Sequence, residues 1–156
     1  MNIRIDYLTG DINVIGTLAK WHYDAFNEHN PVDSVERRID FLRKQAGSNQ
    51  IPMTLVAFSG QTPVGSASII DHDMDTRPDL SPWLATVCVG PEYQNQGAGS
   101  ALVKRAVEEA KRLGLKTLYL FTWDKENLYA RLGWTVFERT EYRGEQVVIM
   151  SIQIGP

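Results

Sequence analysis

Residues 87–102 read VCVGPEYQNQGAGSAL, and this stretch decides how the rest of the chain is interpreted. An apolar, strand-like run ends in a polar turn, and glycines then open an amphipathic segment. Gly97 and Gly99 have no Cβ atom, so the backbone can approach a ligand closely there. A helix N-terminus offers unpaired N–H groups and the positive end of a dipole, which together bind phosphate. The stretch therefore predicts either a phosphate-binding turn or simple close packing of a helix.

Two common phosphate-binding motifs are excluded by the residues around these glycines. No Gly-Lys-Ser/Thr sequence follows the turn, so the stretch is not a P-loop. The dinucleotide-binding fingerprint needs a third glycine, which residues 97–102 lack, and the preceding strand lies in the middle of the chain. If the stretch binds phosphate, it belongs to neither of these two motifs.

The rest of the chain is punctuated at short intervals, as expected for a single domain over residues 1–156. Apolar runs and alternation predict strands, and helical apolar spacing predicts helices. The strands are expected at 3–7, 53–58, 64–70, 84–89, 116–121, 134–142 and 146–152, and the helices at 15–26, 33–42, 97–113 and 124–132. This order predicts a mixed sheet with helices on its faces, in the α/β or α+β class.

Local signals refine three of these segments. Asp33 and Glu36 have the spacing of a capping box, and Asp124 is expected to cap the helix over 124–132. The charged residues of the helix over 97–113 are expected to form a solvated face. The loop over 71–82 is long for a compact domain, and long loops are often functional.

Composition excludes several function classes. The 156 residues include 16 Lys and Arg against 19 Asp and Glu, with a net charge of −3, so a general basic field for nucleic acid is missing. Cys88 is the only cysteine, which excludes a disulfide framework and multi-cysteine zinc sites. No apolar run approaches the about 20 residues of a membrane span, and no secretory signal is visible. We expect a cytoplasmic protein that binds neither nucleic acid nor membrane.

Two motifs together resemble those of one enzyme family. Residues 94–99, QNQGAG, resemble the Gln/Arg-x-x-Gly-x-Gly/Ala signature of the GNAT superfamily of acetyl-CoA-dependent N-acetyltransferases. Residues 128–134, LYARLGW, resemble the second signature of this family, at the expected separation. The resemblance covers most of the chain, and it implies the GNAT acyl-CoA N-acyltransferase fold, with about seven strands and about four helices.

The resemblance implies that acetyl-CoA is the acetyl donor and that a primary amine attacks it directly. Tyr129 takes the place of the family's general acid, which gives a proton to the leaving thiolate; a phenol of pKa near ~10 suits that role. Thr122 stands where many members have Asn, while Asn127 lies in a different register. The implied coenzyme-binding residues are Val87, Cys88, Val89, Gln94, Asn95, Gln96, Gly97, Ala98, Gly99, Ser100 and Thr122. The alternative is a non-catalytic acyl-CoA-binding or regulatory module of the same fold.

The sequence identifies the residues that would bind the acceptor amine less clearly than those that would bind the coenzyme. His72 is the first candidate for the general base, and His22 and the loop acids Asp71, Asp73, Asp75 and Asp79 are further candidates. His22, Asp71 and Trp83 are candidates for binding a small-molecule or peptide amine. Both histidines also have a simpler interpretation: His22 as a core histidine, and His72 as a solvated loop residue. Asp71, Asp73 and Asp75 copy the start of a calcium loop, but its later ligand positions are not matched, so no metal is expected. The sequence leaves the possibility of a homodimer open.

Overall fold

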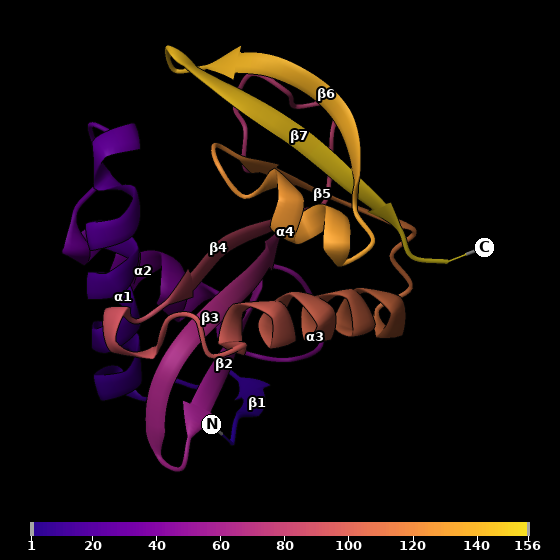
Figure 1. Ribbon diagram of the computed structural model, residues 1–156. Helices are drawn as coiled ribbons and strands as arrows, with labels where there is room; N and C mark the ends of the chain where they lie inside the picture. Colours follow the sequence, from indigo (N-terminus) through magenta and orange to yellow (C-terminus); the bar gives the residue numbers. More distant parts are fainter. Residues whose placement is uncertain (1, 156) are drawn as a thin grey trace.

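The computed structural model describes residues 2–155 and contains one seven-stranded mixed sheet with strand order β1-β2-β3-β4-β5-β7-β6 (Figure 1). Four α-helices and two short 3-10 turns complete the fold, so the predicted mixed sheet with helices on its faces is confirmed. The strands are β1 (Arg4–Tyr7), β2 (Met53–Ser59), β3 (Thr62–Ile70), β4 (Trp83–Val89), β5 (Thr117–Thr122), β6 (Thr135–Tyr142) and β7 (Glu145–Gln153). The helices are α1 (Ile12–Phe26), α2 (Val35–Lys44), α3 (Ala98–Arg112) and α4 (Glu126–Arg131), and the turns are η1 (Asn27–His29) and η2 (Pro91–Tyr93).

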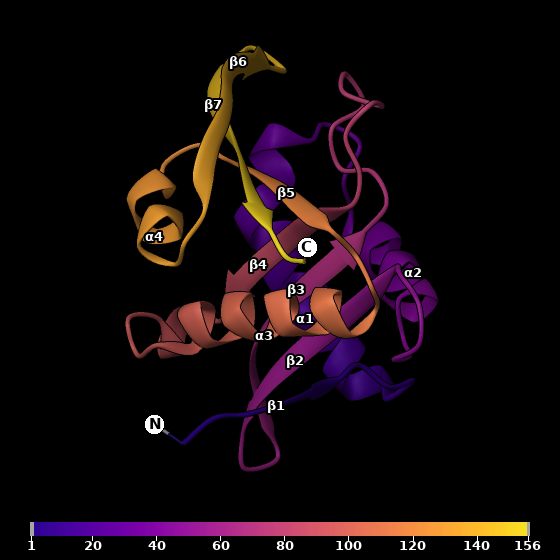
Figure 2. The ribbon, with the colours of Figure 1, turned by 90° about the vertical axis from the view of Figure 1, so that its right-hand side faces the viewer.

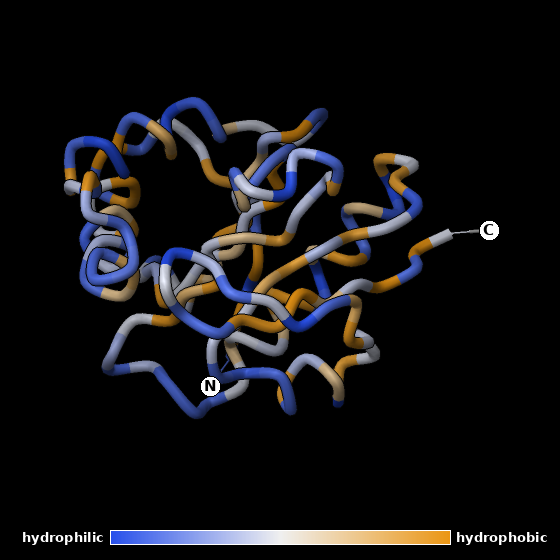
Figure 3. The backbone as a smooth tube through the Cα atoms, turned by 90° about the horizontal axis from the view of Figure 1, so that it is seen from above, coloured by the Kyte–Doolittle hydropathy of each residue, from blue (hydrophilic) through white to orange (hydrophobic). Residues whose placement is uncertain are grey.

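Helices cover both faces of the sheet. Side chains alternate between the faces of a strand. On β2, Leu55 and Ala57 accordingly pack in the core beneath α3, whereas Val56 packs with α1 and α2. Figure 2 shows α3 crossing one face while α1 and α2 lie behind the other. In Figure 3 the apolar stretches run through the middle of the molecule, and many of the outer loops are hydrophilic. Within residues 2–155, no helix combines the length and apolarity needed to cross a membrane.

The sheet is split between β4 and β5. These parallel strands pair only at Trp83 and Tyr119, and the Tyr119 N–H donates to the Pro82 carbonyl at 3.0 Å. On the other side of β4, the register with β3 shifts around Thr86, whose φ of 50° is unusual for a β-branched residue. Beyond Trp83, the edge of β4 that faces β5 therefore has no strand partner within residues 2–155. This gap positions the site.

Two helix starts differ from the predictions. Ser34, not Asp33, caps α2 by accepting from the Arg37 N–H at 3.1 Å. The Asp33 carboxylate is instead held by the Arg38 guanidinium at 2.9–3.0 Å. Helix α4 begins at Glu126, and Asp124 does not cap it; before it, the Thr122 hydroxyl accepts from the Lys125 N–H at 3.0 Å. In both places the hydroxyl of a neighbouring residue, Ser34 or Thr122, accepts the local backbone hydrogen bond in place of the predicted aspartate.

The sequence predicted that the charged face of α3 is solvated, but one of its residues is buried. Glu109 is buried and accepts hydrogen bonds from the Tyr7 hydroxyl at 2.7 Å, Arg112 Nε at 2.9 Å and Arg105 Nε at 3.1 Å. Desolvation opposes ionisation of Glu109, but these hydrogen bonds together lower its pKa below the usual value. The carboxylate ties α3 to the edge strand β1, a contact that no helical periodicity could reveal.

The Glu109 network predicts a pH-dependent contribution to stability. Glu109→Gln should lower the free energy of unfolding by about 2 kcal/mol near pH 7, because it removes charge-assisted hydrogen bonds. A carboxylate with a depressed folded-state pKa stabilises fully above its unfolded pKa of about 4.3 and loses that contribution as pH falls through the lower value. The difference in free energy of unfolding between wild type and Glu109→Gln, measured by urea unfolding, should therefore decrease below about pH 4.

The matched control is Glu108→Gln, since Glu108 is exposed one position away on the same helix. It should change stability by no more than about 0.5 kcal/mol. Equal stability of the two variants at pH 7 would contradict the assigned role of Glu109.

Candidate active site

Two cavities meet at the gap between β4 and β5. The first, which we call the turn cavity, has a volume of about 520 Å³ and lies beside the turn at residues 94–100. The second, the loop cavity, has a volume of about 450 Å³ and reaches the loop at residues 71–82. Four residues line both cavities: Phe26, Val87, Lys125 and Tyr129. A group bound in one cavity can therefore contact a group bound in the other.

The turn cavity ends at a row of free backbone donors. Asn95 and Gly97 have φ values of 62° and 92°, which turn the chain sharply before the 15-residue helix α3. No amide of residues 94–100 donates to another group of the described chain. The amides at a helix N-terminus preceded by such a turn form a concave anion site. A Cβ on Gly99 would lie 3.7 Å from the Val89 side chain, and both residues line the turn cavity. These features fit a pyrophosphate.

Strand β4 continues the turn cavity with unpaired backbone. Val87, Cys88 and Val89 line it, as does Trp21 from α1. A Cβ at Gly90 would meet the Trp21 ring at 2.5 Å, so only glycine lets this indole lie against the end of the strand. Burial raises the pKa of the Cys88 thiol to about 11, which keeps the thiol protonated and weakly reactive.

Tyr129 lies where the two cavities meet. It is buried on α4 and contacts Trp134 edge-on, with ring centroids 6.2 Å apart. Its carbonyl accepts from the Trp134 N–H at 3.0 Å, so residues 128–134 fold back on themselves. Burial, with a smaller effect of the Asp124 charge, raises the pKa of Tyr129 to about 12. The hydroxyl therefore carries its proton at neutral pH, and it is a weaker acid than the ordinary phenol expected from the sequence.

The loop cavity contains both histidines predicted to matter. His22 is buried, with Nε2 at 2.7 Å from the Ser66 hydroxyl, and burial together with the Arg38 charge lowers its pKa to about 3. It is therefore neutral at physiological pH. His72 is exposed and also lines this cavity. Thr122 is buried in the wall, with its hydroxyl engaged by the Lys125 amide.

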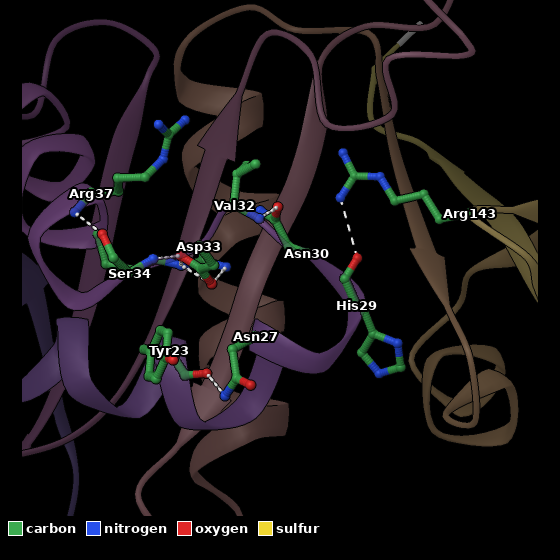
Figure 4. A network of polar contacts seen from close by, with 10 residues as sticks. Tyr23, Asn27, His29, Asn30, Val32, Asp33, Ser34, Arg37 and Arg143 are labelled. Atoms are coloured by element: carbon green, nitrogen blue, oxygen red, sulfur yellow. Dashed lines mark hydrogen bonds and ion pairs between the residues drawn. The ribbon is translucent and has the colours of Figure 1, made fainter.

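The β6–β7 hairpin closes one side of the loop cavity against η1. His29 stacks on Trp123 with ring centroids 4.0 Å apart and forms an ion pair with Glu145. Arg143 Nη1 donates to the His29 carbonyl at 3.3 Å, as Figure 4 shows. Segments far apart in the sequence thus form a single wall.

Some predicted site residues lie outside these cavities. Trp83 is fully buried in a core cluster, and its indole N–H donates to the Leu80 carbonyl at 2.8 Å. Asp71 is exposed and lines neither cavity. Gln96 and Ala98 belong to the turn but do not line the turn cavity. Across residues 2–155, no group of three or more His, Cys, Asp or Glu side chains is arranged to hold a metal ion.

The structure also adds two residues that the sequence did not single out, Arg38 and Arg143, and it selects Asp73 from the acids of the loop. All three line the loop cavity. They come from α2, from the loop before β4 and from the β6–β7 turn, and no spacing rule connects such distant segments. Asp73 was one of several loop acids, and no local signal separated it from Asp71 or Asp75.

Comparison with known proteins agrees with the overall fold. The chain is similar over its whole length to yncA of Salmonella typhimurium, solved with its cofactor acetyl-CoA, at 19% identity and a TM-score of 0.77, with 96% of that chain covered. It resembles a GNAT-family acetyltransferase of Streptococcus pneumoniae at 22% identity and a TM-score of 0.70, with 99% of this chain and 100% of that chain covered. It also resembles an aminoglycoside 6'-N-acetyltransferase complexed with coenzyme A, at 16% identity and a TM-score of 0.76, with 98% of each chain covered.

These structural likenesses concern the fold, and a match to a family model carries the assignment further. The model of the acetyltransferase (GNAT) family matches residues 15–134, which is more than half of the chain and includes both signature motifs. The chain belongs to the GNAT acetyltransferase family.

Proposed function

We propose that this protein transfers an acetyl group from acetyl-CoA to a primary amine, with the donor in the turn cavity and the acceptor in the loop cavity. The observation that carries the proposal is the position of Tyr129, which lines both cavities at the gap between β4 and β5. When bound, acetyl-CoA supplies an acetyl group activated as a thioester.

The donor would be held mainly by backbone. The free amides of residues 94–100 bind the pyrophosphate, and the unpaired edge of β4 near Val87 and Val89 binds the extended arm of the coenzyme. An amide of that edge polarises the thioester oxygen as an oxyanion donor does. The net charge of −3 fits this arrangement, because the anion is bound by local dipoles and not by a basic surface.

Tyr129 is the general acid of the proposal. Its hydroxyl has no hydrogen-bond partner among residues 2–155, and burial keeps it protonated. It donates to the sulfur as the carbon–sulfur bond breaks. With a pKa of about 12, it delivers this proton only while negative charge builds on the sulfur.

The acceptor would enter through the loop cavity. His22 and His72 are the sequence-derived candidates that line it. His22 is neutral and bonded to Ser66, so it suits orientation of the amine, whereas the exposed His72 could accept a proton at the mouth. A volume of about 450 Å³ suits a small amine or the end of a peptide.

Tyr129→Phe tests the general acid. The ring and its packing on Trp134 remain, so acetyl-CoA should bind with unchanged affinity in calorimetry. Release of free coenzyme A thiol with a panel of primary amines should fall by about 100-fold in kcat, the usual size of acid–base catalysis. Tyr119→Phe, a half-buried tyrosine outside both cavities, is the control. Undiminished kcat in Tyr129→Phe would refute the acid role, and tight binding without turnover in wild type would favour a non-catalytic module.

Gly99→Val tests the amide cradle. The branched side chain would extend toward Val89 at the mouth of the cradle, and the dissociation constant of acetyl-CoA should rise about tenfold or more, equivalent to at least about 1.4 kcal/mol. Gly16→Ala is the control, since a Cβ there meets no atom within 4 Å and lies in α1. Calorimetric titration with acetyl-CoA measures both variants. An unchanged affinity of Gly99→Val would remove the turn from the proposed binding site.

A further inference from the structure

We infer that Asp73 binds the acceptor as a primary ammonium and takes its proton, and that the acceptor is a monocationic amine on an apolar or aromatic body. This inference rests on the proposed function and extends it to the identity of the acceptor. Its basis is the chemistry of the loop cavity.

Asp73 is a half-buried carboxylate without a partner. It lies between β3 and β4 and lines the loop cavity, and no hydrogen bond or ion pair reaches its side chain from residues 2–155. Removing an ionised carboxylate from water is costly unless a cation or donor compensates. Burial raises the pKa of Asp73 to about 6, although the charges of Arg38 and Arg143 oppose this change. A cation delivered into the cavity would supply the missing partner.

The two arginines near Asp73 already have partners. Arg38 makes a two-pronged contact with Asp33, at 2.9 and 3.0 Å, and Asp33 itself is buried. Arg143 donates to the His29 carbonyl and lies 3.7 Å from Asp75. Among residues 2–155, Asp73 is thus left as a half-buried acid of the loop cavity that is free to receive a ligand.

The walls around Asp73 favour a single positive charge on an apolar body. The Phe121 ring meets Trp123 and Tyr142 edge-on, at centroid distances of 5.3 and 5.4 Å, and all three line the cavity. Aromatic faces attract an ammonium group and also pack against its hydrocarbon part. A polycation fits poorly, because three cations of the lining, Arg38, Lys125 and Arg143, outnumber the two carboxylates, Asp73 and Asp124.

The other titratable groups of the loop cavity must be compared with Asp73 as the source of a pH dependence. The remaining titratable side chains of the lining are His22 of α1, His29 of η1, His72 beside Asp73, Tyr129 of α4 and Tyr142 of β6. Burial keeps His22 neutral and Tyr129 protonated, and it also raises the pKa of Tyr142. Of the groups in the lining whose pKa is displaced, only Asp73 has a pKa close to neutral pH, at about 6, and a general base works best there.

The proton balance of the reaction can be assigned. Asp73 accepts one proton of the ammonium, and the freed lone pair forms the carbon–nitrogen bond to the acetyl carbon while the carbon–sulfur bond breaks. The Tyr129 hydroxyl gives its proton to the sulfur. The second proton lost by the nitrogen restores Tyr129, and Asp73 releases its proton to water. The net products are the amide, the free thiol and one proton.

Asp73→Asn tests the inference by kinetics. Coenzyme A release is measured with phenethylamine, n-butylamine and spermidine from pH 5 to 9. In wild type, kcat/KM for the two monoamines should exceed that for spermidine and fall about tenfold per pH unit below about pH 6. Asp73→Asn should lower kcat/KM by about 100-fold at pH 7.5 and abolish this acid limb. Asp75→Asn, an exposed acid two residues away, should stay within about twofold of wild type.

Two kinetic results would overturn the inference. One is an acid limb that persists in Asp73→Asn, and its loss in His72→Gln would then assign it to His72. The other is a preference for spermidine over both monoamines. Circular dichroism and thermal unfolding check that each variant is folded.

A second measurement does not depend on turnover or on a variant. The carboxyl resonance of Asp73 is titrated by NMR in the wild-type protein, alone and with phenethylamine. The ammonium should lower the measured pKa from about 6 to about 5 or below, whereas the neutral isostere 2-phenylethanol should not. A pKa unmoved by the amine refutes the inference even if no amine is turned over. Acetyl-CoA binding is measured in parallel: its absence refutes the proposed function, whereas its presence with an unresponsive Asp73 refutes the acceptor assignment alone.

Discussion

The gap between β4 and β5 is the constraint on which the rest of the site depends. A parallel pair would normally satisfy the backbone groups along its whole length, but here the pairing stops at Trp83 and Tyr119. Two cavities occupy the opened region, and they meet at Val87 and Tyr129. The backbone freed in this way is what an extended ligand can bind. The irregular register around Thr86 is the local departure from β geometry that accompanies the opening.

Burial then determines the protonation state of each group around the gap. It keeps the Tyr129 hydroxyl and the Cys88 thiol protonated and keeps His22 neutral. The same desolvation raises the pKa of Asp73 to about 6, because no hydrogen bond or ion pair from residues 2–155 reaches its carboxylate and the charges of Arg38 and Arg143 oppose the change only in part. By contrast, Glu109 is buried but accepts hydrogen bonds from three donors, and its pKa falls. The presence or absence of partners, more than burial alone, separates a structural carboxylate from a candidate catalytic one.

The two halves of the molecule are joined around the loop cavity by polar and aromatic contacts between distant segments. The stacked pair of His29 and Trp123, together with Glu145 and Arg143 of the last hairpin, connects η1 with β5 and the β6–β7 turn. On the opposite side of the sheet, Arg105 and Arg112 join α3 to β1 through Glu109 and Tyr7. The site is therefore supported by contacts between several elements and not by a single loop.

The sequence by itself determined the element order, the mixed sheet and the two signature motifs, because periodicity, glycine positions and short-range spacing are local properties. It also placed Tyr129 and the turn at residues 94–99 in one site, through the family resemblance. Only the tertiary structure decided which loop acid lines the cavity, that Trp83 belongs to the core, and that Glu109 is buried. These outcomes depend on which surfaces of distant segments meet, and one-dimensional patterns carry no such distances. Asp71, Asp73 and Asp75 look alike in sequence, and their different surroundings in the fold are what distinguish them.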